Sequence, residues 1–222
     1  MIQPSTLKFL KELKKNNTKE WFDKNRKIYE SAKADFISLV DDVIVKFGKK
    51  DESIAALQSK NCIFRINRDI RFSKDKSPYK TNMGASFSKG GKRATVAGYY
   101  FHLEPGNSFV GGGIYMPEAD TIKKIRQEID YCFADFSKII KHKKFVAQYG
   151  DLDKSADISL AREPKGYEKE NPAIDYLKLK SWIVMKPVSD TELTDKTLIP
   201  KIITAFEALQ PLVEFLNRAI EV

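Results

Sequence analysis

The chain has 222 residues and a formal charge of +9, from 39 Lys and Arg against 30 Asp and Glu. Hydrophobic residues make up 42% and aromatic residues 11%, which excludes a disordered chain, a collagen-like chain and a disulfide scaffold. No apolar run approaches the roughly 18–20 residues that a membrane span needs. A chain of this length predicts one domain, or two small ones that share a core.

Helices are predicted for residues 1–50, where apolar residues recur at helical spacing. The longer of two apolar faces runs from Trp21 to Phe47 without a break, which predicts one continuous helix. Asn17 and Glu20 have the spacing of a capping box, so we expect Asn17 to cap this helix.

Short strands are predicted for residues 61–116, because alternating apolar runs there are separated by turn residues. The expected strands are 62–66, 82–88, 95–104 and 108–116. Short connections between successive strands favour an antiparallel meander. A fifth strand, 181–188, is expected at a sheet edge because Pro187 cannot donate to a ladder.

Helix is predicted again for residues 117–149, and residues 150–222 are expected to hold a loop, the edge strand and a C-terminal helix. No alternation of strand, helix and strand occurs, so we expect an α+β fold. It consists of a single antiparallel sheet of about five strands, packed by long N-terminal, middle and C-terminal helices. We interpret residues 1–222 as one domain.

The two cysteines, Cys62 and Cys132, have no CxxC neighbour and no nearby histidine. We interpret both as buried structural thiols, and we predict no metal site and no cofactor. The N-terminus shows no signal-peptide pattern, and we expect a cytoplasmic protein.

The most unusual stretch is RINRDIRFSKDKSPYK at 65–80, with six basic residues and two aspartates. Arginine forks, lysine charges and loop amides together suit a phosphate or a carboxylate. The candidate ligand-binding residues in it are Arg65, Arg68, Asp69, Arg71, Lys74, Asp75, Lys76, Tyr79 and Lys80. The alternative is a structural hairpin in which these arginines are paired with the protein's own acids.

Three further candidates lie on the predicted strands. Tyr100 and His102 alternate along one strand and therefore share a face. Gly112 lies within a run of three glycines, which marks a bulge, a close backbone approach or a surface open to a ligand. No serine-hydrolase elbow and no dinucleotide-binding glycine motif is present, so catalytic residues cannot be assigned.

Four segments carry a resemblance to a known family. They are FLKELKKNNTKEWFDKNRKIYE at 9–30, FRINRDIRFSKDKSPYKTN at 64–82, GYYFHLEPGNSFVGGGIYMPEADTIKKIRQEI at 98–129 and REPKGY at 162–167. Together they resemble an uncharacterised family of bacterial proteins, domain-of-unknown-function family 2461. The resemblance implies a free-standing α+β domain and no settled activity, cofactor or catalytic residue.

The charge distribution leads to three functional hypotheses. Residues 61–104 hold nine basic and three acidic side chains, which favours binding of an anionic small molecule. One alternative is a nucleic-acid-binding domain that uses the same stretch. It would add Lys89, Lys92 and Arg93, with Tyr79 or Tyr99 for stacking. The other is a structural or interaction protein without a pocket. No membrane partner is expected, and neither a reaction nor an oligomeric state can be assigned.

Overall fold

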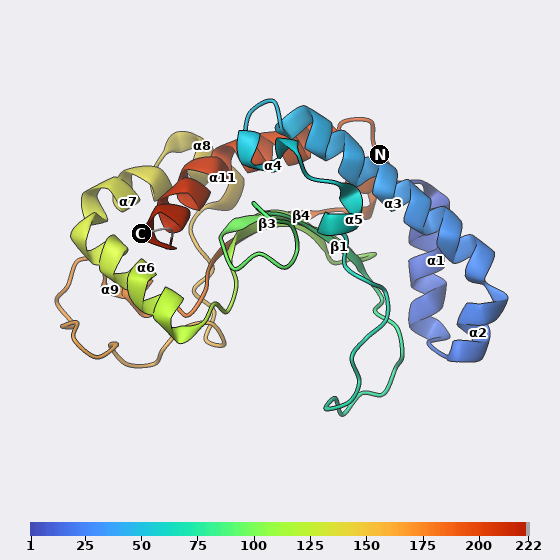
Figure 1. Cartoon of the computed structure of the whole chain (residues 1–222), viewed down its shortest axis with the longest axis horizontal. Coiled ribbons are helices and arrows are strands. Elements are labelled where there is room, and N and C mark those ends of the chain that lie inside the picture. The colour runs from blue at the N-terminus through green and yellow to red at the C-terminus, as the bar shows by residue number, and fades with distance from the viewer. Residues whose placement is uncertain (221–222) are drawn as a thin grey trace. The chain divides into compact units, whose positions relative to one another are not determined.

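The computed structural model describes residues 1–220 and contains eleven helices and four strands in that range (Figure 1). The helices are α1 (Pro4–Lys15), α2 (Lys19–Lys24), α3 (Arg26–Phe47), α4 (Glu52–Ala55), α5 (Ser59–Cys62), α6 (Ala119–Tyr131), α7 (Phe133–Ile140), α8 (Lys143–Tyr149), α9 (Ile174–Leu177), α10 (Asp190–Leu193) and α11 (Leu198–Ile220). The strands are β1 (Met83–Phe87), β2 (Gly98–Leu103), β3 (Ser108–Ile114) and β4 (Trp182–Val188).

The strands form one antiparallel sheet in the order β1-β2-β3-β4. This order confirms the α+β class and the predicted meander. It also places β4, which contains Pro187, at an edge of the sheet as predicted. No helix in residues 1–220 combines the length and the apolar character needed to cross a membrane.

The prediction of about five strands is wrong, because residues 62–66 do not form a strand. Cys62 ends helix α5, and the extended residues after it make only isolated bridges, Ile63 to Ala85 and Asn67 to Tyr79. Three residues lie between these bridges on one segment and five on the other. A continuous ladder needs equal numbers, so the pairing is interrupted.

The prediction of one continuous helix from Trp21 to Phe47 is also wrong, because the chain breaks at Asn25 between α2 and α3. The Asn25 amide donates a 2.8 Å hydrogen bond to the Trp21 carbonyl and competes with the helical backbone bonds. The cap of α2 is Thr18, whose hydroxyl accepts from the Trp21 N–H. Asn17 has a different partner, described below.

Contacts between residues group the chain into two compact units, and both draw on β2, β3 and β4. The first contains Met1–Arg93, Tyr100–Val110 and Pro187–Thr204. The second contains Ala94–Tyr99, Gly111–Lys186 and the described residues from Ala205 onward. The interpretation of the chain as one domain stays a prediction.

Each unit has an aromatic core. In the first, Phe36 of α3 stacks on Phe101 of β2, with ring centroids 6.3 Å apart. In the second, Phe136 of α7 packs against Tyr176 and Phe215. Such pairs combine a large buried apolar area with a defined geometry. In the first unit this core fixes which face of β2 is buried.

Candidate functional site

One face of β2 carries polar side chains. Tyr100 and His102 alternate along the strand and Glu104 follows directly, whereas Phe101 and Leu103 between them are buried in the core. Successive side chains of a strand point to opposite faces, so the three polar groups lie on the same side. The sequence prediction that Tyr100 and His102 share a face is consistent with this arrangement.

These three side chains form a hydrogen-bonded relay. The Tyr100 hydroxyl lies 3.3 Å from His102 Nδ1, and His102 Nε2 lies 3.5 Å from Glu104 Oε2. A carboxylate can only accept, so His102 donates from Nε2 and its Nδ1 accepts from the phenol. The imidazole of His102 therefore joins the phenol of Tyr100 to the half-buried carboxylate of Glu104.

Glu104 is held by several donors. Thr81 Oγ1 and Asn107 Nδ2 each lie 3.2 Å from its carboxylate, and Lys14 Nζ lies 3.8 Å away. Burial alone would raise the pKa of Glu104, but the hydrogen bonds from Asn107, His102 and Thr81 outweigh it and hold the pKa below its ordinary value. The carboxylate stays ionised near neutral pH.

The other two members of the relay are neutral near pH 7. Burial lowers the pKa of His102, although Glu104 acts in the opposite direction, and burial raises the pKa of Tyr100 to about 12. Glu104 favours the imidazolium form of His102, but burial outweighs it, so the relay stays a neutral imidazole and a neutral phenol beside one carboxylate.

Aromatic rings surround the relay. The His102 ring stacks on Phe109 with centroids 4.8 Å apart and 10° between the planes. Tyr100 packs 5.7 Å from Phe109 and, edge to face, 6.3 Å from Phe64. The Tyr100 hydroxyl lies over Gly84 of β1, at a place that a Cβ on residue 84 would occupy. Gly84 therefore makes room for the phenol.

Two neighbouring cations lie next to these aromatic rings: Lys80, which is half-buried beside Phe64, and Arg65, which is exposed. Lys80 Nζ is 5.5 Å from the Phe64 ring centroid, and burial together with the nearby Arg65 charge lowers the pKa of Lys80. No ion pair or side-chain hydrogen bond joins either cation to another residue in 1–220. Arg65 does help to lower the pKa of Asp69, but that carboxylate is hydrogen-bonded to a different arginine.

The contacts close into a ring. Thr81, which follows Lys80, bonds Glu104 at one end of the relay, and Phe64, which precedes Arg65, packs on Tyr100 at the other. We refer to this set as the β2 cluster. Its members are Phe64, Lys80, Thr81, Tyr100, His102, Glu104 and Phe109, and Arg65 is included as the charged neighbour of Lys80. All of them belong to the first compact unit.

Most of the other predicted ligand-binding residues are held by the protein itself. Arg68 pairs with Asp75, and Arg71 makes two hydrogen bonds to Asp69, of 2.9 and 2.6 Å. Lys76 donates a 3.0 Å bond to the Ile70 carbonyl. For these residues the geometry agrees with the structural alternative. Arg65 and Lys80 at the base of the stretch, and Lys74 within it, have no acid partner in the described chain.

The two tyrosines proposed for stacking on nucleic acid are buried. Tyr79 is 6% exposed and Tyr99 is 1% exposed, so neither ring presents a face to a base. Tyr79 stacks on Phe22, with centroids 3.9 Å apart. Lys92 donates to the carbonyls of Lys60 and Ile63.

Gly112 lies in β3, where neighbouring strands approach closely. A Cβ at this position would meet the Gly98 carbonyl, and its φ of +154° is uncommon for residues with a side chain. At Gly113, with a φ of +110°, a Cβ would meet the Trp182 carbonyl. The protein backbone fills the space that the glycines leave, which is the structural reading of this run.

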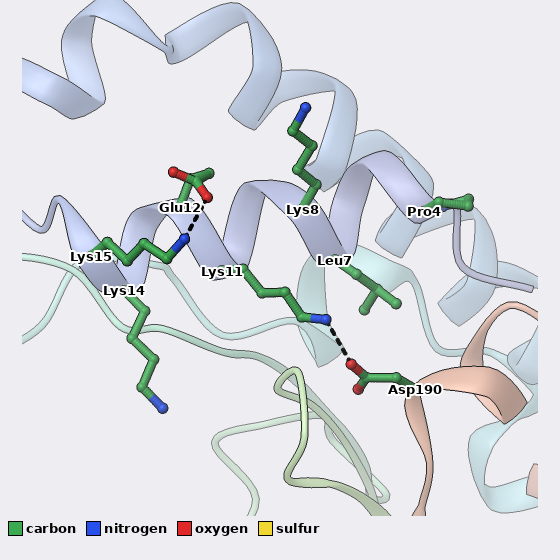
Figure 2. Close-up of a pocket in the computed structure, with 8 residues that line it drawn as sticks. All are labelled: Pro4, Leu7, Lys8, Lys11, Glu12, Lys14, Lys15 and Asp190. Atoms are coloured by element: carbon green, nitrogen blue, oxygen red, sulfur yellow. Dashed lines mark hydrogen bonds and ion pairs between the residues drawn. The ribbon is translucent and has the colours of Figure 1, made fainter.

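A hollow of about 480 Å³ lies along α1, and all of its lining residues belong to the first compact unit (Figure 2). Figure 2 shows Lys11 reaching Asp190 and Lys15 reaching Glu12, whereas Lys8 projects to the other side of the helix. The residues that line the hollow are Pro4, Leu7, Lys8, Lys11, Glu12, Lys14, Lys15 and Asp190. Lys14 connects this hollow to the β2 cluster through its 3.8 Å contact with Glu104.

Sequence reasoning missed five residues of this site: Phe64, Thr81, Glu104, Phe109 and the adjacent Lys14. Glu104 was detectable, because it continues the alternation of Tyr100 and His102. Phe64, Thr81 and Lys14 come from segments before β2 and carry no local signal, and Phe109 lies on the next strand.

The described residues do not supply a metal centre, since no group of three or more His, Cys, Asp and Glu is arranged to hold an ion in residues 1–220.

Cys62 is buried as predicted, and burial raises the pKa of its thiol to about 11. Cys132 is only half-buried, so the prediction of a buried thiol is wrong there. The residue ends α6 near the surface.

The fold and the β2 cluster define a small α+β protein with a polar and aromatic site on an antiparallel sheet. Residues 5–215 match the family described as conserved hypothetical protein (DUF2461), and the chain belongs to this family. The match confirms the resemblance found in the sequence. No curated protein and no solved structure matches the chain.

Proposed function

We propose that the protein binds a small anionic molecule, bearing a phosphate or a carboxylate, at the β2 cluster. The observation that supports this is a pair of neighbouring cations, the half-buried Lys80 beside Phe64 and the exposed Arg65, neither of which has an acid partner in the described chain. Two like charges close together in a partly buried place repel each other, and an anion between them removes that repulsion.

Each group of the cluster has a role in this proposal. Arg65 offers a planar fork that matches the oxygens of a phosphate or carboxylate, and Lys80 adds a compact charge. The Tyr100 hydroxyl, which burial keeps protonated, donates to His102 and adds no negative charge beside the anion. The rings of Phe64 and Phe109 supply an apolar wall for the remainder of the molecule.

The proposal can be tested by calorimetric titration and by thermal shift. The probes are inorganic phosphate, sugar phosphates, nucleotides and small di- and tricarboxylates. The test variants are Arg65→Gln and Lys80→Met. Arg71→Gln is a matched control, because it removes the same charge from an arginine that is exposed and already paired with Asp69.

We expect at least one probe to raise the unfolding temperature of the wild type and of Arg71→Gln. Removal of either cluster cation should weaken its binding about tenfold or more, the usual effect of losing a charge-assisted bond. Equal binding by wild type, Arg65→Gln and Lys80→Met would contradict the proposal. An equal loss in Arg71→Gln would reduce it to a general charge effect.

A further inference from the structure

The most exposed large hydrophobic side chain in the described chain is Phe72, which is 95% exposed. It lies on a loop that begins and ends at the bridge between Asn67 and Tyr79, and we call residues 67–79 the arm. In Figure 1 the arm extends away from β1 as a long loop without helix or strand. Nothing in the β2 cluster uses Phe72.

The arm is braced by its own polar side chains. Asp75 pairs with Arg68 and accepts hydrogen bonds of 2.9 and 2.6 Å from the backbone N–H and hydroxyl of Ser77. Lys76 donates to the Ile70 carbonyl across the loop. The exposed ring is therefore presented on a loop with internal bonds on both sides of it.

One face of the Phe72 ring is already in contact with a cation. The Arg71 guanidinium carbon lies 5.7 Å from the ring centroid, and Arg71 is held in place by its two bonds to Asp69. With 95% of the residue exposed, the opposite face of the ring is open. A flat group placed there would complete a sandwich of guanidinium, phenyl ring and ligand.

The charges of the arm favour a polyanion. Its two carboxylates, on Asp69 and Asp75, are both paired with arginines. Lys74 and Lys76 then remain as positive charges without an acid partner in the described chain. An exposed aromatic ring beside uncompensated cations is the arrangement that proteins use to bind single strands of nucleic acid.

We infer that the arm binds single-stranded nucleic acid, with a base stacked on Phe72 and backbone phosphates beside Lys74 and Lys76. The inference does not rest on the proposed small-anion site, because it uses neither Arg65 nor Lys80. A lipid surface fits less well, since Phe72 is the only fully exposed apolar residue of the arm.

The inference can be tested by fluorescence anisotropy with labelled 15-nucleotide oligo(dT) and oligo(U), about 15 being long enough for one binding site. The variants are Phe72→Ala and Phe72→Trp, and the matched control is Tyr131→Ala, which removes another highly exposed aromatic ring. Phe72 contacts no core residue, so the variants should keep the wild-type unfolding temperature. Phosphatidylserine vesicles serve as the alternative anionic partner.

We expect Phe72→Ala to weaken oligonucleotide binding about tenfold and Tyr131→Ala to leave it unchanged. Phe72→Trp should lose more fluorescence than the wild type when the oligonucleotide binds, because the wild type has only Trp21 and Trp182 to report and stacking at position 72 adds its own quenching. A double change of Lys74 and Lys76 to Gln should reduce the salt dependence of binding.

Three outcomes would overturn the inference. These are no oligonucleotide binding by the wild type, equal binding by wild type and Phe72→Ala, or vesicle binding that depends on Phe72 in the absence of oligonucleotide binding. Arg65→Gln and Lys80→Met should keep the Phe72-dependent oligonucleotide binding measured by anisotropy, so a failure of the small-anion site is distinguishable from a failure of the arm.

Discussion

Asn17 anchors the arm to the N-terminal helices, and its loss should destabilise the protein. The Asn17 amide donates a 2.9 Å bond to the Tyr79 carbonyl, and its oxygen accepts a 3.1 Å bond from the Tyr79 N–H. Tyr79 is nearly fully buried, with its ring stacked on Phe22. Asn17→Ala leaves both of these main-chain groups without their partner.

The size of the effect follows from these two bonds. A buried polar group left unpaired costs about 1–3 kcal/mol, and the half-buried position of Asn17 gives water partial access after truncation. We therefore expect Asn17→Ala to lower the free energy of unfolding by about 2–4 kcal/mol. Because Lys80 follows Tyr79, anion binding at the β2 cluster should weaken in the same variant.

Urea unfolding followed by circular dichroism measures this difference, provided that the slope with denaturant is unchanged. Asn16→Ala is the matched control, since the Asn16 amide bonds only the Glu12 carbonyl in the same helix. Asn16→Ala should lower the free energy of unfolding by less than about 1 kcal/mol. If the two alanine variants have the same stability, the reasoning about the anchor is refuted.

Three further predictions concern the sheet. Gly84→Ala should displace the Tyr100 hydroxyl and break its hydrogen bond to His102. The nitrogen NMR signal of His102 Nδ1 should then shift, and an unchanged spectrum would contradict the packing of Tyr100 on Gly84. Gly113→Ala should lower the free energy of unfolding by more than about 3 kcal/mol, because the new Cβ would collide with backbone atoms and the φ is unfavourable for alanine. Gly106→Ala should lower it by only about 1 kcal/mol, because Gly106 has a φ of +79° but open space around it. If urea unfolding gives similar losses of stability for the two variants, the close approach of the Trp182 carbonyl to Gly113 does not explain the glycine. Burial lowers the pKa of His102 from its ordinary 6.5, so below that pH the unfolded chain binds a proton that the folded protein does not, and stability falls as the pH falls. Measured by urea unfolding, the free energy of unfolding should fall less between about pH 7.5 and about pH 5 in His102→Phe than in the wild type. An equal fall in both proteins would refute this.

Local patterns predicted most of the secondary structure, because apolar periodicity reports which face of an element is buried. The four ladder strands and the long C-terminal helix lie where alternation and helical spacing place them. The failures occurred where a side chain competes with the backbone, as Asn25 does, or where pairing depends on a distant segment. The interrupted ladder at Ile63 and Asn67 is set by the number of residues between bridges, which no single segment reveals.

The amino-acid sequence alone determined that this chain concentrates positive charge in its central third and places Tyr100 and His102 on one face of a strand. Only the tertiary structure decided which cations are neutralised. Arg68 pairs with Asp75 within its own loop, whereas Lys80 lies beside Phe64 with Arg65 as a neighbouring charge and no acid partner. The physical reason is that an ion pair depends on separation in space, and bonds such as that of Thr81 to Glu104 join residues 23 positions apart.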